Sequence, residues 1–165
     1  MRPIGFSTGA LAYADFRKGL TIITEMGMDT IELSALRISE WEPLLRALPT
    51  LDLSSFIYVS VHLPSKMNKE EELVVISSLE KWKDQFKWPL VLHPDAITDW
   101  TAWQRLGRTI SIENMDMRKQ IGRTEAELTE IFTTLPEASF CFDIGHAWQV
   151  DPTMSEAYWI LKNLS

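Results

Sequence analysis

The sequence predicts an α/β fold of the (β/α)₈-barrel type, with about six βα units in a single domain over residues 1–165. Short apolar runs alternate with helix-like segments along the chain, and strand followed by helix implies parallel strands joined by right-handed crossovers. The repeat averages about 30 residues, close to the unit length of such barrels. In addition, five of the six strands divide into one apolar face and one small or polar face.

The alternation places strands near residues 3–7, 30–34, 57–62, 89–93, 109–113 and 139–143. Helices are expected at roughly 15–27, 39–48, 68–86, 99–106, 124–134 and 153–163. Local signals define some helix ends. Asn68 precedes three glutamates in a first turn, where an N-cap side chain and negative charge both favour a helix. Thr124 and Glu127 have the spacing of a capping box, and Gly27 suits a helix stop.

The two faces of each strand favour a barrel over a doubly wound open sheet. In the third strand Val59 and Val61 share one face, opposite Ser60 and His62. The first, second, fifth and sixth strands repeat this division. An open sheet with helices on both sides would make both faces apolar. Helices on the outside alone leave a small or polar face to line the barrel interior.

Composition narrows the class of protein. The net charge of −7 argues against a broad nucleic-acid surface, although a local basic rim could offset it. No apolar stretch reaches the roughly 18 residues of a membrane span. The N-terminus enters a strand-like segment directly, so we expect no signal peptide. The single cysteine, Cys141, cannot form an internal disulfide, which favours a reducing cytoplasm. Because Cys141 lies in an apolar run, we expect it to be a core residue. The residues of the basic rim are Arg37, Arg118, Lys119 and Arg123.

Five metal-binding side chains stand at the carboxyl ends of strands. They are His62, His93, Glu113, Asp143 and His146. Imidazole and carboxylate bind zinc, manganese or iron, and barrel enzymes place their sites at this end of the strands. We therefore expect one continuous arc, with Glu113 at its centre and two possible metal positions. Glu32 lies in the same layer and is a candidate ligand contact. Trp148 follows His146 and could stack on a sugar or a base.

These motifs resemble the xylose isomerase-like TIM-barrel superfamily, which contains sugar-phosphate isomerases and epimerases together with endonuclease IV. The resemblance covers essentially all 165 residues as the first six of eight units. Its most specific pieces are Ser111-Ile112-Glu113-Asn114 and Cys141-Phe142-Asp143-Ile144-Gly145-His146. Val61-His62-Leu63-Pro64 and Leu92-His93-Pro94 support them. The family's further ligands, a His and a Glu on strands seven and eight, have no counterparts in these six units.

The resemblance implies a divalent metal ion of the Mn²⁺ or Zn²⁺ type, bound by Glu113 and Asp143. His146 would bind substrate or a further metal. In the isomerase and epimerase branch Glu113 also acts as an acid/base, moving a proton next to a carbonyl while the metal stabilises an enediolate. His62 and His93 would contact the substrate, a sugar or sugar phosphate.

Two other functions are compatible with the sequence. In the endonuclease IV branch, residues matching His62, His93 and Glu113 hold zinc, and a metal-bound hydroxide attacks a phosphate of abasic DNA. The acidic charge favours the sugar enzyme over this nuclease. A non-catalytic partial barrel that binds a ligand or partner is the third reading. Six parallel strands would leave two unpaired edges, which a second copy of the chain could complete.

Overall fold

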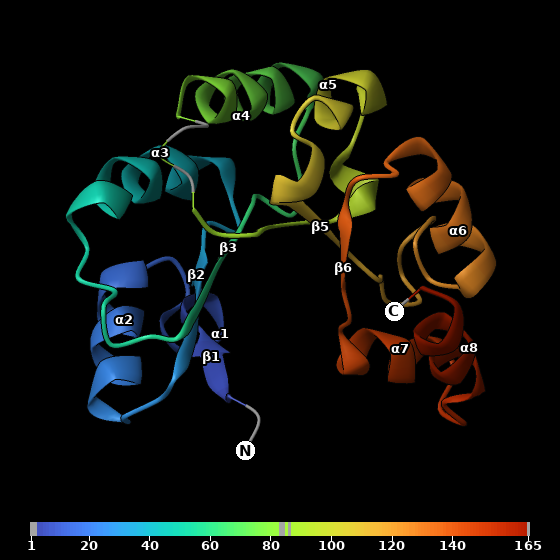
Figure 1. Cartoon of the computed structure of the whole chain (residues 1–165), viewed down its shortest axis with the longest axis horizontal. Helices are drawn as coiled ribbons and strands as arrows, with labels where there is room; N and C mark the ends of the chain where they lie inside the picture. The colour runs from blue at the N-terminus through green and yellow to red at the C-terminus, as the bar shows by residue number, and fades with distance from the viewer. Residues whose placement is uncertain (1–2, 83–84, 86, 165) are drawn as a thin grey trace. The chain divides into compact units, whose positions relative to one another are not determined.

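The computed structural model describes residues 3–82, 85 and 87–164. Within these residues six parallel strands alternate with helices, as the sequence predicts (Figure 1). The chain forms two compact units, Met1–Leu90 and Val91–Ser165, each with buried apolar residues of its own. The expectation of a single domain over residues 1–165 stays a prediction.

The first unit contains three parallel strands in sequence order, β1 (Gly5–Ser7), β2 (Thr30–Ser34) and β3 (Tyr58–His62). In their register Ser7 lies beside Glu32, and Ser34 lies beside His62. The polar side chains expected on one face therefore follow one another across the strands. The helices of this unit are α1 (Thr8–Ala12), α2 (Phe16–Glu25), α3 (Ile38–Ala47), the 3₁₀ turn η1 (Leu48–Thr50) and α4 (Lys69–Trp82).

The core of the first unit forms from the apolar faces of the strands and helices. Ile31, Leu33 and Val61 of the strands are buried, as are Trp41 of α3 and Leu79 of α4. The indole Nε1 of Trp41 donates a hydrogen bond to Ser78 Oγ at 2.8 Å, so the polar atom of this large core residue is satisfied. The apolar face predicted for these strands is thus the one that packs against helices.

The second unit begins within β4 (Leu90–Leu92), and its strands follow the order β4, β5 (Ile110–Glu113), β6 (Ser139–Cys141). β5 and β6 are parallel, with Glu113 opposite Cys141. The other elements are η2 (Pro94–Ala96), α5 (Trp100–Gln104), η3 (Gly107–Thr109), α6 (Glu125–Thr134), α7 (Ile144–Val150) and α8 (Ser155–Leu164). Helix α8, at the red end of the chain, packs beside α6 (Figure 1).

The predicted helix ends are confirmed by their hydrogen bonds. Asn68 Oδ1 accepts from the backbone N–H of Glu71, and the Glu71 carboxylate accepts in return from the N–H of Asn68. Thr124 Oγ1 accepts from the N–H of Glu127 as expected, whereas the Glu127 carboxylate accepts from the N–H of Arg123. Gly27 has φ +67°, which a glycine adopts readily.

Two short helices, α1 and α7, were not predicted. Each follows a strand after at most two residues, and five or seven residues are too few to display a helical period. The predicted helix over 68–86 is confirmed to Trp82, and residues 83, 84 and 86 lie outside the described residues. In the part of the chain that the structure describes, no helix is long and apolar enough to cross a membrane.

Candidate active site

The candidate site lies in the second unit, at the carboxyl ends of its strands. Glu113 is the last residue of β5, His93 follows directly after β4, and Asp143 and His146 stand at the start of α7, just beyond β6. Because β5 and β6 are neighbouring parallel strands, their carboxyl ends meet on the same side. Four of the residues predicted from strand ends therefore come from three adjacent segments of one unit.

The carboxylate of Glu113 is buried between two imidazole rings. Its Oε2 lies 3.2 Å from His93 Nε2, and its Oε1 lies 3.4 Å from His146 Nδ1. The two rings are 6.2 Å apart at their centres and nearly perpendicular, and the Glu113 side chain is 8 % exposed. A buried charge is stable only when it is paired or hydrogen-bonded. Here each oxygen of the carboxylate has a ring nitrogen beside it.

Asn114 joins the end of β5 to the start of α7. This residue is fully buried, and its Nδ2 donates to the backbone carbonyl of Asp143 at 2.9 Å. Its Oδ1 accepts from the backbone N–H of Asp143 at 2.7 Å. Both backbone groups of Asp143 are thereby satisfied by one side chain. No pattern in the sequence predicts a role for Asn114, and its one signal is its place directly after Glu113.

Asp143 and His146 are oriented by the first turn of α7. Asp143 is the N-cap of the helix, and its Oδ1 accepts from the backbone N–H of His146 at 2.7 Å. His146 Nδ1 lies 2.8 Å from the carbonyl oxygen of Asn114. A carbonyl cannot donate, so Nδ1 carries the hydrogen and donates it. In the neutral ring the lone pair is then on Nε2.

Glu113, Asp143 and His146 fit a divalent cation by donor type, since two carboxylates and an imidazole suit zinc or manganese. One candidate ligand atom from each lies within 4.8 Å of the others. Nδ1 of His146 faces both carboxylates, at 3.4 Å from Glu113 and 3.9 Å from Asp143. It could ligate only after giving up the hydrogen that it donates to Asn114. As arranged, the two carboxylates could hold a cation, and His146 is a hydrogen-bond donor.

An ion pair between the buried Asp116 and the exposed Arg118, which no sequence pattern predicts, borders the site. Asp116 Oδ2 lies 4.0 Å from His146 Nε2 and 2.5 Å from Arg118 Nη2. Hydrogen bonds from the Arg118 side chain hold the pKa of the Asp116 carboxyl well below its usual range, against the opposing effect of burial. A single acidic residue in a loop carries no periodic signal, so only the folded chain identifies it.

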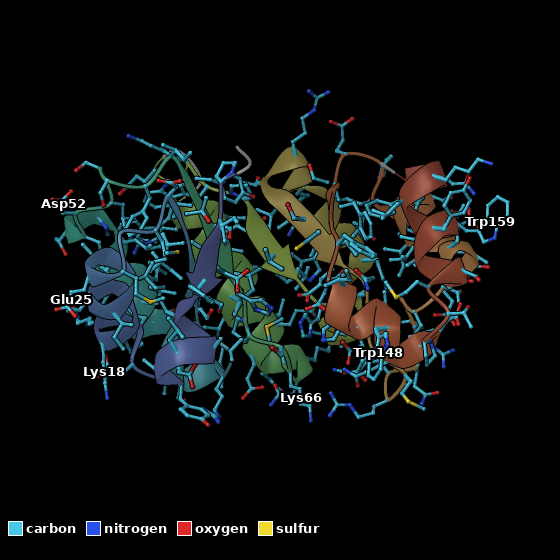
Figure 2. The ribbon with its side chains drawn as sticks, turned by 90° about the horizontal axis from the view of Figure 1, so that it is seen from below. Lys18, Glu25, Asp52, Lys66, Trp148 and Trp159 are labelled. Atoms are coloured by element: carbon cyan, nitrogen blue, oxygen red, sulfur yellow. The ribbon has the colours of Figure 1, made fainter. Side chains whose placement is uncertain are left out.

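His62, Glu32 and Trp148 complete the set of predicted site residues. His62 ends β3 in the first unit, where its Nδ1 lies 2.6 Å from the carbonyl of Leu63. Glu32 is half-buried and lines a hollow of about 200 Å³ together with Ser7 and Ser60 of the same unit. Trp148 lies at the surface of α7 with 58 % of its area exposed (Figure 2). Its spacing of two from His146 places it on another side of that helix.

A solved structure supports the fold. The crystal structure of a D-tagatose 3-epimerase-like protein matches 99 % of this chain and 73 % of its own length, with a TM-score of 0.63 and 16 % sequence identity. No family model and no curated protein matches the chain. The predicted α/β fold of the (β/α)₈-barrel type, with about six βα units, is therefore confirmed. At this identity the likeness concerns the fold alone.

Proposed function

We propose that this protein is a divalent-metal-dependent sugar isomerase or epimerase. One observation carries the proposal: the buried carboxylate of Glu113 lies between His93 and His146 at the carboxyl end of β5. A carboxylate that is shielded from water and lies beside two imidazole rings is suited to remove a proton from a carbon atom and to return it. The barrel fold and the name of the similar solved protein support a carbohydrate as substrate.

Glu113 and Asp143 would hold the cation. When bound, a divalent cation stabilises the negative charge that develops on a carbonyl oxygen as the neighbouring carbon loses its proton. Asp143 suits this place because its Oδ1 caps α7 while its side chain is still 38 % exposed. Its position is fixed by Asn114, which binds both its backbone groups.

Glu113 would also remove and return the proton. Its carboxylate would take the hydrogen from the carbon next to the carbonyl and return it on the same side, to the neighbouring carbon, which is an isomerisation. Inversion at a single carbon would need a second acid/base on the opposite face. The rings of His93 and His146, which lie on either side of the Glu113 carboxylate, would orient the substrate. From the sequence we further expect His62 and Glu32 to contact hydroxyl groups and Trp148 to stack on the sugar.

Proton exchange tests the proposal directly. Protein loaded with Mn²⁺ or Zn²⁺ is incubated with a panel of ketoses in D₂O, and deuterium in the recovered sugar is measured by mass spectrometry. We expect incorporation by the wild type and a loss of about 100-fold or more in Glu113→Gln. Glu137→Gln is the matched control. This exposed glutamate forms an ion pair with Arg108, a residue that precedes β5, and so lies away from the carboxyl ends of the strands. Absence of exchange above the metal-only background, or equal exchange in Glu113→Gln, would reject the proposal.

A second function, a zinc phosphodiesterase of the endonuclease IV type, is favoured by the 3.2 Å separation of His93 Nε2 and Glu113 Oε2. In the nuclease branch the matching residues, together with that of His62, bind zinc. Zinc-loaded protein would then nick duplex DNA at an abasic site, and His93→Gln would lose this activity. Intact abasic DNA after incubation at low salt, where phosphate contacts are strongest, excludes the nuclease.

A further inference from the structure

The loop between β5 and α6, residues 114–124, is compact and fixed. The N–H of Met115 donates to the carbonyl of Gly122 at 2.7 Å, which brings the two ends of the loop together, and Met115 is fully buried. Lys119 Nζ lies 2.5 Å from Asp95 Oδ2, in the turn that follows His93. The loop is therefore anchored to the same segments that carry the candidate site.

Arg118 is held in this loop by Asp116. Its Nε and Nη2 donate to the two carboxylate oxygens at 2.9 and 2.5 Å, and its backbone N–H donates to Oδ1 at 2.8 Å. The Asp116 side chain is 2 % exposed and that of Arg118 is 75 % exposed. A guanidinium has five N–H donors in a rigid plane, so one edge is fixed by the buried carboxylate while the remaining donors face outward.

Arg118 and His146 flank the same oxygen. Asp116 Oδ2 accepts from Arg118 Nη2 and lies 4.0 Å from His146 Nε2. The exposed guanidinium thus stands at the border of the candidate site. The two other cations of the loop differ from it. Lys119 is bound to Asp95 and is 18 % exposed, and Arg123 is bound to Glu127 and is 34 % exposed.

We propose that Arg118 is the anion-binding residue of this site and that the substrate is a sugar carrying a phosphate monoester. The inference rests on the proposed function and specifies its substrate class. A planar guanidinium matches two phosphate oxygens at once, and a partner that fixes its orientation reduces the entropy lost on binding. In a chain of net charge −7, a fixed cation at the site also attracts a dianion that the surrounding carboxylates would repel.

Binding measured without turnover tests the proposal. Calorimetric titrations compare ribulose 5-phosphate, ribulose and inorganic phosphate on the metal-loaded protein. We expect the phosphate ester to bind about tenfold or more tightly than the free sugar, since hydrogen bonds to charged groups have about this effect. Arg118→Gln should abolish this preference and leave the affinity for ribulose within about twofold. Arg118→Lys should restore only part of it, because lysine keeps the charge without the planar fork.

Arg108→Gln is the matched control. This arginine is also exposed and also paired with one carboxylate, that of Glu137, but it precedes β5. It should keep the full preference for the phosphate ester. Three results would overturn the proposal: no preference in the wild type, an equal loss in Arg108→Gln, or tighter binding of abasic duplex DNA than of the ester through Arg118. Thermal melts of each variant verify that the fold is intact.

The two proposals fail in different ways. Preferential binding of the ester without deuterium exchange in any sugar would reject the isomerase function and would still support anion binding by Arg118. Exchange in free and phosphorylated ketoses at equal efficiency, unchanged by Arg118→Gln, would reject the anion site and keep the isomerase function.

Discussion

The His146 ring is oriented by Asn114, the residue that follows Glu113: its Nδ1–H donates to the Asn114 backbone carbonyl at 2.8 Å. The Asn114 side chain also binds both backbone groups of Asp143. One buried residue at the end of β5 therefore positions both members of the Asp143–His146 motif. The site depends on this hydrogen-bonded junction as well as on the residues that would perform chemistry.

Asn114→Ala should destabilise the protein and weaken metal binding together. The substitution leaves the backbone N–H of Asp143 without the partner it has here, whereas the Asp143 carbonyl keeps the hydrogen bond from the Ala147 N–H. One unpaired backbone group costs about 1–3 kcal/mol when it stays buried. We expect a loss of about 1–3 kcal/mol in urea unfolding and a clear loss of zinc affinity. Asn163→Ala, which removes a 3.3 Å bond at the surface of α8, is the control and should change stability by less than about 0.5 kcal/mol. Equal effects of both variants would contradict the role given to Asn114.

Two substitutions of Asp143 should separate its structural and metal-binding roles. Its Oδ1 caps α7, and loss of an N-cap side chain costs about 0.5–2 kcal/mol. Asp143→Ala should therefore lower both unfolding free energy and metal affinity. Asp143→Asn keeps a capping oxygen but loses the charge, so it should retain nearly all the stability and still bind metal poorly. If Asp143→Asn binds metal like the wild type, Asp143 is not a ligand.

The Asp116–Arg118 pair should make stability depend on acid pH. The pKa of Asp116 is lowered in the folded chain, chiefly by side-chain hydrogen bonds from Arg118. A depressed pKa contributes stability that is full above the unfolded value of about 3.9 and is lost as pH falls through the folded value. In metal-free protein, the difference in unfolding free energy between wild type and Asp116→Asn should stay constant between about pH 5 and about pH 8. It should shrink steadily below about pH 4. A difference that grows in acid would show the sign to be wrong.

The sequence was sufficient for the strands but not for every helix. Apolar and polar residues alternate in the third strand, with Val59 and Val61 on one face and Ser60 and His62 on the other. This period of two predicts a strand whose apolar face packs against helices. By contrast, α7 is stabilised by its N-cap residue Asp143, and Gly145 within it predicts a turn from the local sequence. Short capped helices depend on such single contacts, which a periodic pattern cannot reveal.

The candidate site was predictable to a similar extent. Glu113, His93 and the Asp143–His146 pair follow from the rule that polar residues at the carboxyl ends of strands converge, and the structure brings these four together. Their chemical roles stay predictions. Asn114, Asp116 and Arg118 were not identified as parts of the site, because a loop residue acts through the particular atoms that it reaches. No spacing in the sequence encodes that the Asp116 carboxylate faces both Arg118 and His146.

Gly122, in the loop that carries Arg118, should be harder to replace than Gly27. Its φ is +79°, and a Cβ there would stand 2.7 Å from Pro94 Cγ and 3.2 Å from Met115 Cγ. Gly27 is the matched control, because its φ is +67° but a Cβ would meet nothing within 4 Å. Gly27→Ala carries only the left-handed backbone cost of about 1–2 kcal/mol, whereas Gly122→Ala adds a clash that must displace the loop or the turn after His93. We therefore expect Gly122→Ala to unfold at lower urea concentration than Gly27→Ala, and to lose affinity for ribulose 5-phosphate while Gly27→Ala keeps it. Equal stability losses in the two variants would mean that the loop is not packed against Pro94 as described.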